Sequence, residues 1–246
     1  MPPTDPTAPT AAPPDRAAIR AYLDSLTKRI AGEGSPDLPS ALISGAIRCG
    51  KTRVARQVCN ATGLVRLETD HLRNALILGL SEGDKRRVTK YVYRQILLRH
   101  PRGLLIDGTA LMDAPCELPL WARRRGILFF AIGYSEGRVP DKTRDLLAFR
   151  ASNPCWTRKM TDDAGVKRLA RQIIQRSKEV RGFCAAHDLP YFHLDSGQFE
   201  AERDRVAREI EAHIRRHHAQ TAPSGLMARL TSWRRAWFRA GDPPAR

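Results

Sequence analysis

GAIRCGKT, at residues 45–52, fits the pattern G-x-x-x-x-G-K-[ST] at every fixed position. The apolar run Leu42-Ile-Ser44 precedes it and the helical run Thr52–Val58 follows, which is the strand–loop–helix context that the pattern requires. Glycines let the backbone curl so that its N–H groups point at phosphate oxygens, and the helix N-terminus adds partial positive charge. The stretch therefore predicts a phosphate-binding loop, or P-loop.

The pattern assigns separate roles to the residues of this loop. We expect Lys51 to reach the β- and γ-phosphates as a catalytic residue, and the Thr52 hydroxyl to ligate Mg²⁺. The variable position Cys49 is expected to face the protein interior. A turn that binds no phosphate is the alternative interpretation, which the complete Lys51-Thr52 pair disfavours. The predicted nucleotide-binding residues are Gly45, Ala46, Ile47, Arg48, Cys49, Gly50, Lys51 and Thr52.

A second candidate site follows the next predicted strand, in the stretch ETDHLR at residues 68–73. In parallel sheets, ligands bind outside the carboxyl ends of the strands. Asp70 is predicted to be the general base that accepts the proton of an acceptor hydroxyl. Arg73 lies on the same helix face and is predicted to hold an acidic substrate group or the transferring phosphate. The alternative is that Asp70 only caps the following helix, and the two roles are compatible.

A third candidate is the stretch GLLIDGT at residues 103–109, an apolar strand that ends in an aspartate. Such an aspartate, following a P-loop, typically holds the magnesium ion of a nucleotide. We expect Asp107 to hold a Mg²⁺-bound water and Gly108-Thr109 to face the acceptor. Thr52 and Asp107 together make up the predicted metal site.

Apolar runs of strand length alternate with helical stretches along the chain. This alternation implies a parallel sheet covered by helices on both faces. The predicted fold is an α/β P-loop NTPase three-layer sandwich with a mostly parallel five-stranded sheet. Strands are predicted at Ala41–Ser44, Leu64–Glu68, Gly103–Asp107, Ile127–Ile132 and Tyr191–Leu194, and helices at Lys51–Thr62, Asp70–Leu78, Asp84–Arg99, Ala164–His187 and Glu200–His217.

The ends of the chain differ in composition from its middle. Residues 1–14 are rich in Pro, Ala and Thr and are predicted to be disordered, and 15–37 should form an N-terminal helix and a linker. The P-loop domain is predicted at 38–222, with a helical lid at about 144–181. Residues 223–246 form a basic amphipathic tail, for which a membrane surface, a partner or the chain's own domain all stay open as the docking surface.

The composition limits the classes of protein to which the chain can belong. Of its 246 residues 42% are hydrophobic, which is enough for a core, and no run of 18 apolar residues predicts a membrane span. We see no secretory signal, so the cytoplasm is the expected compartment. Five cysteines without a C-x-x-C pair indicate neither a disulfide framework nor a zinc site. The net charge of +16 favours polyanionic partners without choosing among them.

The three stretches, in this order, resemble the P-loop small-molecule kinases. This group includes gluconate kinase, adenylylsulfate kinase, chloramphenicol phosphotransferase, polynucleotide 5′-kinase, zeta-toxin-like kinases and proteins described as 2-phosphoglycerate kinase. The similarity covers roughly Ser40 to His217. It implies ATP and Mg²⁺ as cofactors, Asp70 as the base, and a mobile lid with arginines before the last strand. In this chain the lid cations map onto Arg158 and Lys159, with Arg144 and Arg150 as the alternative pair.

The predicted function is therefore an ATP- and Mg²⁺-dependent kinase acting on a hydroxyl of a small molecule. A polynucleotide 5′-hydroxyl or nucleotide kinase would suit the basic charge, but aromatic residues for base stacking are only 7% of the chain. A non-catalytic NTP-binding regulatory protein would leave Asp70 without a purpose. A basic nucleic-acid-binding module with a degenerate loop would not need Lys51-Thr52. The sequence leaves open the acceptor, the oligomeric state and the choice of ATP over GTP.

Overall fold

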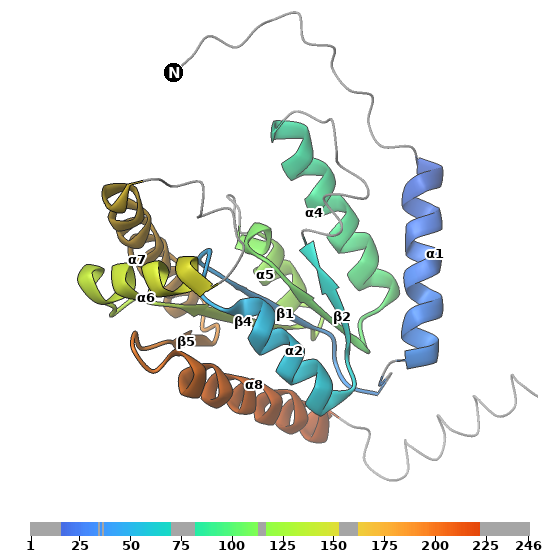
Figure 1. Cartoon of the computed structure of the whole chain (residues 1–246). Helices are drawn as coiled ribbons and strands as arrows, with labels where there is room; N and C mark the ends of the chain where they lie inside the picture. The colour runs from blue at the N-terminus through green and yellow to red at the C-terminus, as the bar shows by residue number, and fades with distance from the viewer. Residues whose placement is uncertain are drawn as a thin grey trace, which may run out of the picture.

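The computed structural model describes residues 16–33, 35, 37–69, 82–112, 117–152 and 162–221. Within these ranges the chain forms one five-stranded sheet between two layers of helices (Figure 1). Every strand pairing is parallel, and the order across the sheet is β2-β3-β1-β4-β5. The strands are β1 (Ala41–Gly45), β2 (Val65–Glu68), β3 (Leu104–Asp107), β4 (Leu128–Gly133) and β5 (Tyr191–His193).

Strand β1 lies at the centre of the sheet and is buried along its whole length. It pairs with β3, where Ile43 is opposite Asp107, and with β4, where Gly45 is opposite Ile132. Since successive side chains of a strand point to opposite faces, Ile43 joins one hydrophobic core and Leu42 joins the other. Strands β2 and β3 lie on one side of β1, and β4 and β5 lie on the other. The loop after β1 is therefore at the point where the strand order changes direction, which is the usual binding crevice of such sheets.

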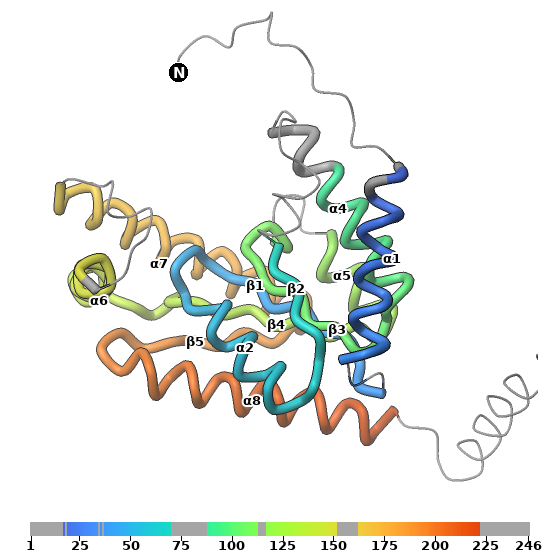
Figure 2. The backbone as a smooth tube through the Cα atoms, turned by 45° about the vertical axis from the view of Figure 1, so that its right-hand side comes forward, coloured from blue at the N-terminus to red at the C-terminus, as the bar shows by residue number. Residues whose placement is uncertain are grey.

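Helices cover both faces of the sheet. One core contains α2, α6, α8 and the first half of α7, whereas the other contains α1, α4, α5 and the end of α7. Helices α2 and α8 lie side by side in both views (Figures 1 and 2). The helices are α1 (Arg16–Glu33), α2 (Lys51–Thr62), α4 (Glu82–Arg99), the 3-10 helix η1 (Thr109–Met112), α5 (Glu117–Arg123), α6 (Val139–Ser152), α7 (Asp163–Ala186) and α8 (Phe199–Thr221).

The N-terminal helix α1 packs on the domain rather than standing apart from it. Leu23, Leu26 and Ile30 recur at helical spacing, and all three are buried in the core that α4 shares. The hydroxyl of Thr27 lies 3.0 Å from the imidazole Nε2 of His100, just after α4. The predicted N-terminal helix is therefore present and forms part of the same hydrophobic core.

The predicted α/β sandwich with a five-stranded sheet is confirmed, and each predicted strand agrees with the structure to within one residue at either end. Helices η1, α5 and α6 were not predicted from the sequence. Helix α6 has a weak apolar pattern because Lys142 is buried beside Leu146, while Val139 and Leu147 pack against the core only in part. The predicted helix Asp70–Leu78 and the tail 223–246 lie outside the described residues. No helix in the described ranges is long and apolar enough to cross a membrane.

Candidate functional site

The loop between β1 and α2 has a backbone that only some residues can adopt. Gly50 precedes α2 in the left-handed conformation, with φ of 84°, and Arg48 is also left-handed, with φ of 56°. At Gly45, a Cβ atom would lie 1.9 Å from the carbonyl oxygen of Ile132 on the neighbouring strand. The first glycine of the motif is thus required by the close approach of β4, and the second by the turn into the helix.

Lys51, the first residue of α2, folds over this loop. Its side chain is buried, and its Nζ donates hydrogen bonds to the carbonyl oxygens of Ala46 at 2.6 Å and Gly45 at 3.3 Å. The Sγ of Cys49 lies 3.6 Å from the same Nζ, and Cys49 is fully buried, as expected. The ammonium group therefore sits at the centre of the curled backbone, where a phosphate would meet it.

Thr52 and Asp107, the predicted metal ligands, lie next to each other. The Thr52 hydroxyl, in the first turn of α2, donates to Oδ2 of Asp107 at the end of β3, over 3.2 Å. Both groups offer oxygen atoms, which are the ligands that Mg²⁺ prefers. No cluster of three or more His, Cys, Asp or Glu side chains that could hold a metal occurs in the described part of the chain. A magnesium ion would fit here only with nucleotide phosphates completing its ligands.

Arg66 on β2 is a site residue that the sequence analysis missed. Its Nε donates to Oδ1 of Asp107 at 2.9 Å, and its Nη2 donates to Oδ2 at 3.3 Å. The same Nη2 lies 2.5 Å from Oε1 of Glu68. Burial raises the pKa of Asp107 above its ordinary value, whereas the hydrogen bonds from Arg66 and Thr52 oppose that rise. Arg66 and Glu68 lie on one face of β2, and the buried residues that alternate with them lie on the other. This period of two was the pattern in the sequence that could have identified Arg66.

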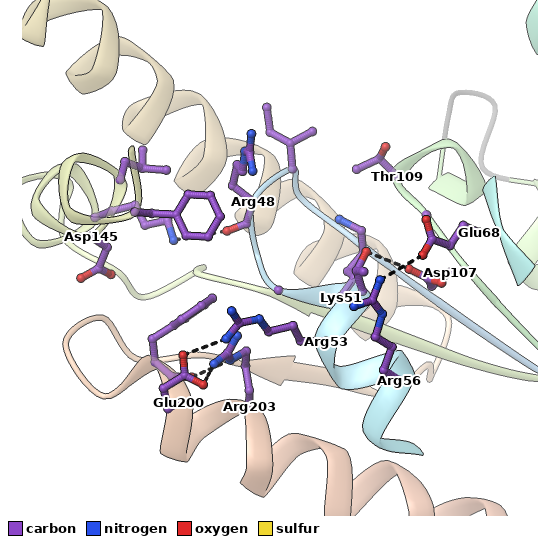
Figure 3. Close-up of a pocket in the computed structure, with 18 of the residues that line it drawn as sticks. Arg48, Lys51, Arg53, Arg56, Glu68, Asp107, Thr109, Asp145, Glu200 and Arg203 are labelled. Atoms are coloured by element: carbon purple, nitrogen blue, oxygen red, sulfur yellow. Dashed lines mark hydrogen bonds and ion pairs between the residues drawn. The ribbon is translucent and has the colours of Figure 1, made fainter. Parts of the chain in front are cut away.

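A cavity of about 900 Å³ opens over the loop. Glu68, Asp107 and Thr109 lie on one side of the loop, a region that we call the carboxylate end (Figure 3). On the other side is the aromatic end, formed by Phe149 of α6 and Phe199 of α8 with the polar residues around them. The lining residues include Ile47, Arg48, Gly50, Lys51, Thr52, Arg53, Arg56, Lys142, Asp145, Leu146, Ala148, Glu200 and Arg203.

Lys142 lines the aromatic end and is a second residue that the sequence analysis missed. It is only 2% exposed, and its Nζ lies 3.5 Å from the centre of the Tyr134 ring and 5.6 Å from that of Phe199. The Nζ also donates to the carbonyl oxygen of Arg48 over 3.5 Å, which connects α6 to the P-loop. Burial lowers the pKa of Lys142 to about 8, and the nearby carboxylate of Asp145 opposes this shift.

Arg203 of α8 completes the aromatic end. The residue is 2% exposed, its guanidinium lies 4.2 Å from the Phe199 ring centre, and its Nε donates to the Phe199 carbonyl oxygen at 3.2 Å. Glu200 pairs with both Arg203 and Arg53 of α2 (Figure 3). A Cβ atom at Gly50 would lie 2.9 Å from Cδ of Arg203, so α8 packs directly against the P-loop.

The described structure tests only some of the predicted site residues. Asp70, Arg73, Arg158 and Lys159 lie outside the described residues, and their roles stay predictions. The alternative lid cations, Arg144 and Arg150, belong to α6 and do not line the cavity. Each pairs with an aspartate, Arg144 with Asp141 at 3.4 Å and Arg150 with Asp163 at 3.1 Å.

Comparison with known proteins gives structural similarity without sequence relatives. No protein-family model matches the chain, and no curated protein matches it either. Similar solved structures include a shikimate kinase from Bacteroides thetaiotaomicron, 11% identical with a TM-score of 0.49, over 71% of this chain and 99% of that one. A shikimate kinase from Acinetobacter baumannii, in complex with shikimate, is 14% identical with a TM-score of 0.48, over 72% and 94% of the two chains.

A gluconokinase from Sinorhizobium meliloti 1021 is 16% identical with a TM-score of 0.39, over 70% of this chain and 95% of that one. All three structures bear the names of small-molecule kinases, the group that the sequence was predicted to resemble.

Proposed function

We propose that this protein is a kinase that transfers the γ-phosphoryl group of ATP, with Mg²⁺, to a hydroxyl of a small-molecule acceptor. The observation that carries the proposal is the meeting of three groups at one end of α2. The Lys51 ammonium lies within the curled loop, and the Thr52 hydroxyl is 3.2 Å from the Asp107 carboxylate. A phosphate-binding backbone, a cation and a pair of metal ligands are what transfer of a phosphoryl group requires.

The cavity suggests how the nucleotide would lie. The triphosphate would occupy the loop, because the backbone N–H groups and Lys51 are there. The base would extend to the aromatic end, because Phe149 and Phe199 offer flat apolar surfaces for stacking. The cations Lys142 and Arg203 line the same end and would add attraction for the nucleotide.

Magnesium, when bound with the nucleotide, would neutralise the charge that develops on the transferring phosphoryl group. Thr52 and Asp107 would hold it, the first through its hydroxyl and the second through a metal-bound water that its carboxylate accepts. Lys51 would bind the β- and γ-phosphates and withdraw negative charge from them. These groups are fixed by the sheet and by α2, so they are oriented before the nucleotide binds.

The proposed reaction is a single displacement at phosphorus. The acceptor hydroxyl oxygen attacks the γ-phosphorus, the bond to the bridging oxygen breaks, and ADP leaves with that electron pair. The hydroxyl proton passes to the carboxylate of Asp70, which follows β2 in the sequence. Arg158 and Lys159 are proposed to close over the transferring group, where water would otherwise compete with the acceptor.

The test is transfer of labelled phosphate from ATP across pooled sugars, sugar acids, hydroxylated antibiotics and 5′-hydroxyl oligonucleotides. We expect one small-molecule pool to be labelled, and Lys51→Ala to lower the rate by about 10²-fold or more. Lys167→Ala is the control, because Lys167 is exposed on α7. Equal rates in Lys51→Ala and wild type would refute the proposed active site. Labelling of the oligonucleotide alone would move the function to a polynucleotide kinase.

A further inference from the structure

A single guanidinium bridges the carboxylates of the carboxylate end. Arg66 makes a two-point contact with Asp107, at 2.9 Å and 3.3 Å, and its Nη2 lies 2.5 Å from Glu68. The side chains are 15%, 3% and 22% exposed, for Arg66, Asp107 and Glu68 in that order. The electrostatic attraction within ion pairs that are this well shielded from water is stronger than in pairs at the surface.

The bridge uses most of the hydrogen-bonding capacity of Asp107. An ionised carboxylate accepts about four hydrogen bonds. Arg66 supplies two of them and the Thr52 hydroxyl supplies a third, so about one acceptor position is left for a metal-bound water. Asp107 is thus held in one orientation toward Thr52, and its charge is already balanced.

The charge around the loop also opposes a free cation. Among the described side chains that line the cavity, six are cationic and four are carboxylates. Arg66, which pairs with two of those four carboxylates, adds a further positive charge. A divalent cation that entered alone would therefore meet a surplus of positive charge, whereas a triphosphate would reverse that balance.

We propose that Arg66 is a positioning residue that makes metal binding depend on nucleotide, by neutralising Asp107 and Glu68 until a triphosphate brings its own negative charge. This inference rests on the proposed function, because it takes the P-loop to bind a nucleoside triphosphate. In the nucleotide-free protein, Arg66 serves as the counter-ion of the carboxylates. In the complex, it keeps Asp107 directed at Thr52 while magnesium and phosphate balance each other.

The test uses Mn²⁺ as a paramagnetic substitute for Mg²⁺, with free Mn²⁺ followed by electron paramagnetic resonance. Once the Mn²⁺ that the nucleotide chelates without protein is subtracted, we expect wild-type protein to bind Mn²⁺ at least about tenfold more weakly without nucleotide than with a non-hydrolysable ATP analogue. In Arg66→Met, nucleotide-free binding should strengthen by about tenfold or more, because two carboxylates lose their counter-ion. The matched control is Arg99→Met, because Arg99 is 42% exposed, pairs with Asp24 of α1 and does not line the cavity.

Two results would overturn the inference. One is wild-type protein that binds the analogue, as calorimetric titration would show, yet binds Mn²⁺ equally well with and without it, and this measurement needs no variant. The other is a nucleotide-free Mn²⁺ affinity of Arg66→Met that equals that of wild type. If Arg66→Met does not fold, the same measurement is made on Arg66→Lys. Arg66→Lys should be intermediate, since it keeps the charge and loses the two-point contact. Failure of the analogue to bind would instead count against the proposed function, while the variant comparison without nucleotide would still test Arg66.

Discussion

The carboxylate end and the aromatic end of the cavity hold their charged groups in different ways. At the carboxylate end, Asp107 is satisfied by Arg66 and Thr52, which come from elements next to it in the sheet or directly after the P-loop. At the aromatic end, Lys142 and Arg203 lie against aromatic rings and donate to backbone carbonyls, and Arg203 also pairs with Glu200. These residues come from helices far apart in the sequence.

Under the proposed function, this difference would separate two roles within one cavity. Groups with fixed partners and fixed orientation suit the step in which charge develops on the phosphoryl group. Cations on aromatic faces provide attraction and packing without a defined direction, which suits binding of the nucleotide. We therefore expect changes at the carboxylate end to lower kcat, and changes at the aromatic end to alter nucleotide affinity and stability.

The largest effect is expected for the proposed base. Asp70→Asn should lower kcat by about 10²-fold or more, the size expected for loss of a general base, with the Kd for Mg·ATP unchanged. Steady-state rates and calorimetric titration measure the two quantities. Asp188→Asn is the control, because Asp188 pairs with Arg123 at the exposed surface. A variant that loses only stability would show that Asp70 is a helix cap.

At the aromatic end, the buried lysine should make stability depend on pH. The pKa of Lys142 falls from its ordinary value of 10.5 to about 8, so between these values the unfolded chain keeps a proton that the folded chain has lost. The cost of burying the charge is therefore present below pH 8 and disappears as the pH rises to 10.5. Relative to Lys142→Met, the free energy of unfolding of the wild type should rise by up to about 3 kcal/mol across this range.

Urea unfolding of both proteins at pH 7, 8.5 and 10 measures this difference. Lys142→Arg is the informative second variant, because a guanidinium stays charged throughout and should show no such rise relative to Lys142→Met. A difference between wild type and Lys142→Met that is constant with pH would mean that the amine is not desolvated in the folded state.

A smaller effect is expected from the stacking surface. Phe199→Leu should weaken nucleotide binding by about tenfold, within the 1–3 kcal/mol that one stacked base contributes, and leave kcat nearly unchanged. Phe183→Leu is the matched control, because Phe183 is also partly buried but packs in the other core, away from the cavity. Equal losses of affinity in the two variants would mean that the adenine base does not stack on Phe199.

The smallest effect is expected outside the cavity. The Arg144 side chain is 76% exposed and pairs with Asp141 one turn away, so Arg144→Ala should cost less than about 0.5 kcal/mol and leave kcat unchanged. Arg158→Ala, in contrast, should slow transfer, which kinetic assays of both variants would show. If Arg144→Ala also slowed transfer, the role of lid cation would have to be assigned to Arg144 on α6. Residues outside the cavity would then no longer be expected to have the smallest effects.

The carboxylate end could be predicted from sequence because its parts are consecutive or end a strand. The P-loop is eight adjacent residues whose chemistry lies largely in the backbone, and Asp107 ends an apolar strand. The role of Arg66 could be predicted only in part, since its spacing from Glu68 shows only that both residues lie on one face of β2. Its pairing with Asp107 depends on the β2–β3 register, which opposes Glu68 to Asp107.

The aromatic end could not be predicted, because only tertiary packing brings its residues together. Helix α6 buries Lys142 in place of an apolar residue, so neither the helix nor the lysine had a periodic signal. Phe199 and Arg203 belong to a helix that was predicted nearly correctly, yet nothing in its pattern indicates contact with Gly50. The fold and the P-loop could be predicted from the sequence, whereas the second wall of the cavity depends on contacts between distant helices.

The packing of α8 against the P-loop has a consequence for how the protein is made. Gly50 is synthesised early, but Phe199 and Arg203, which contact it, emerge about 150 residues later, or about 8 to 30 s at usual rates of translation. Arg53 and Gln57 of α2 likewise can form their hydrogen bonds with Glu200 and Asp204 only after those residues have been synthesised. During synthesis on the ribosome the cavity therefore stays incomplete until its last wall arrives, so the proposed nucleotide could assist only the final stage of folding.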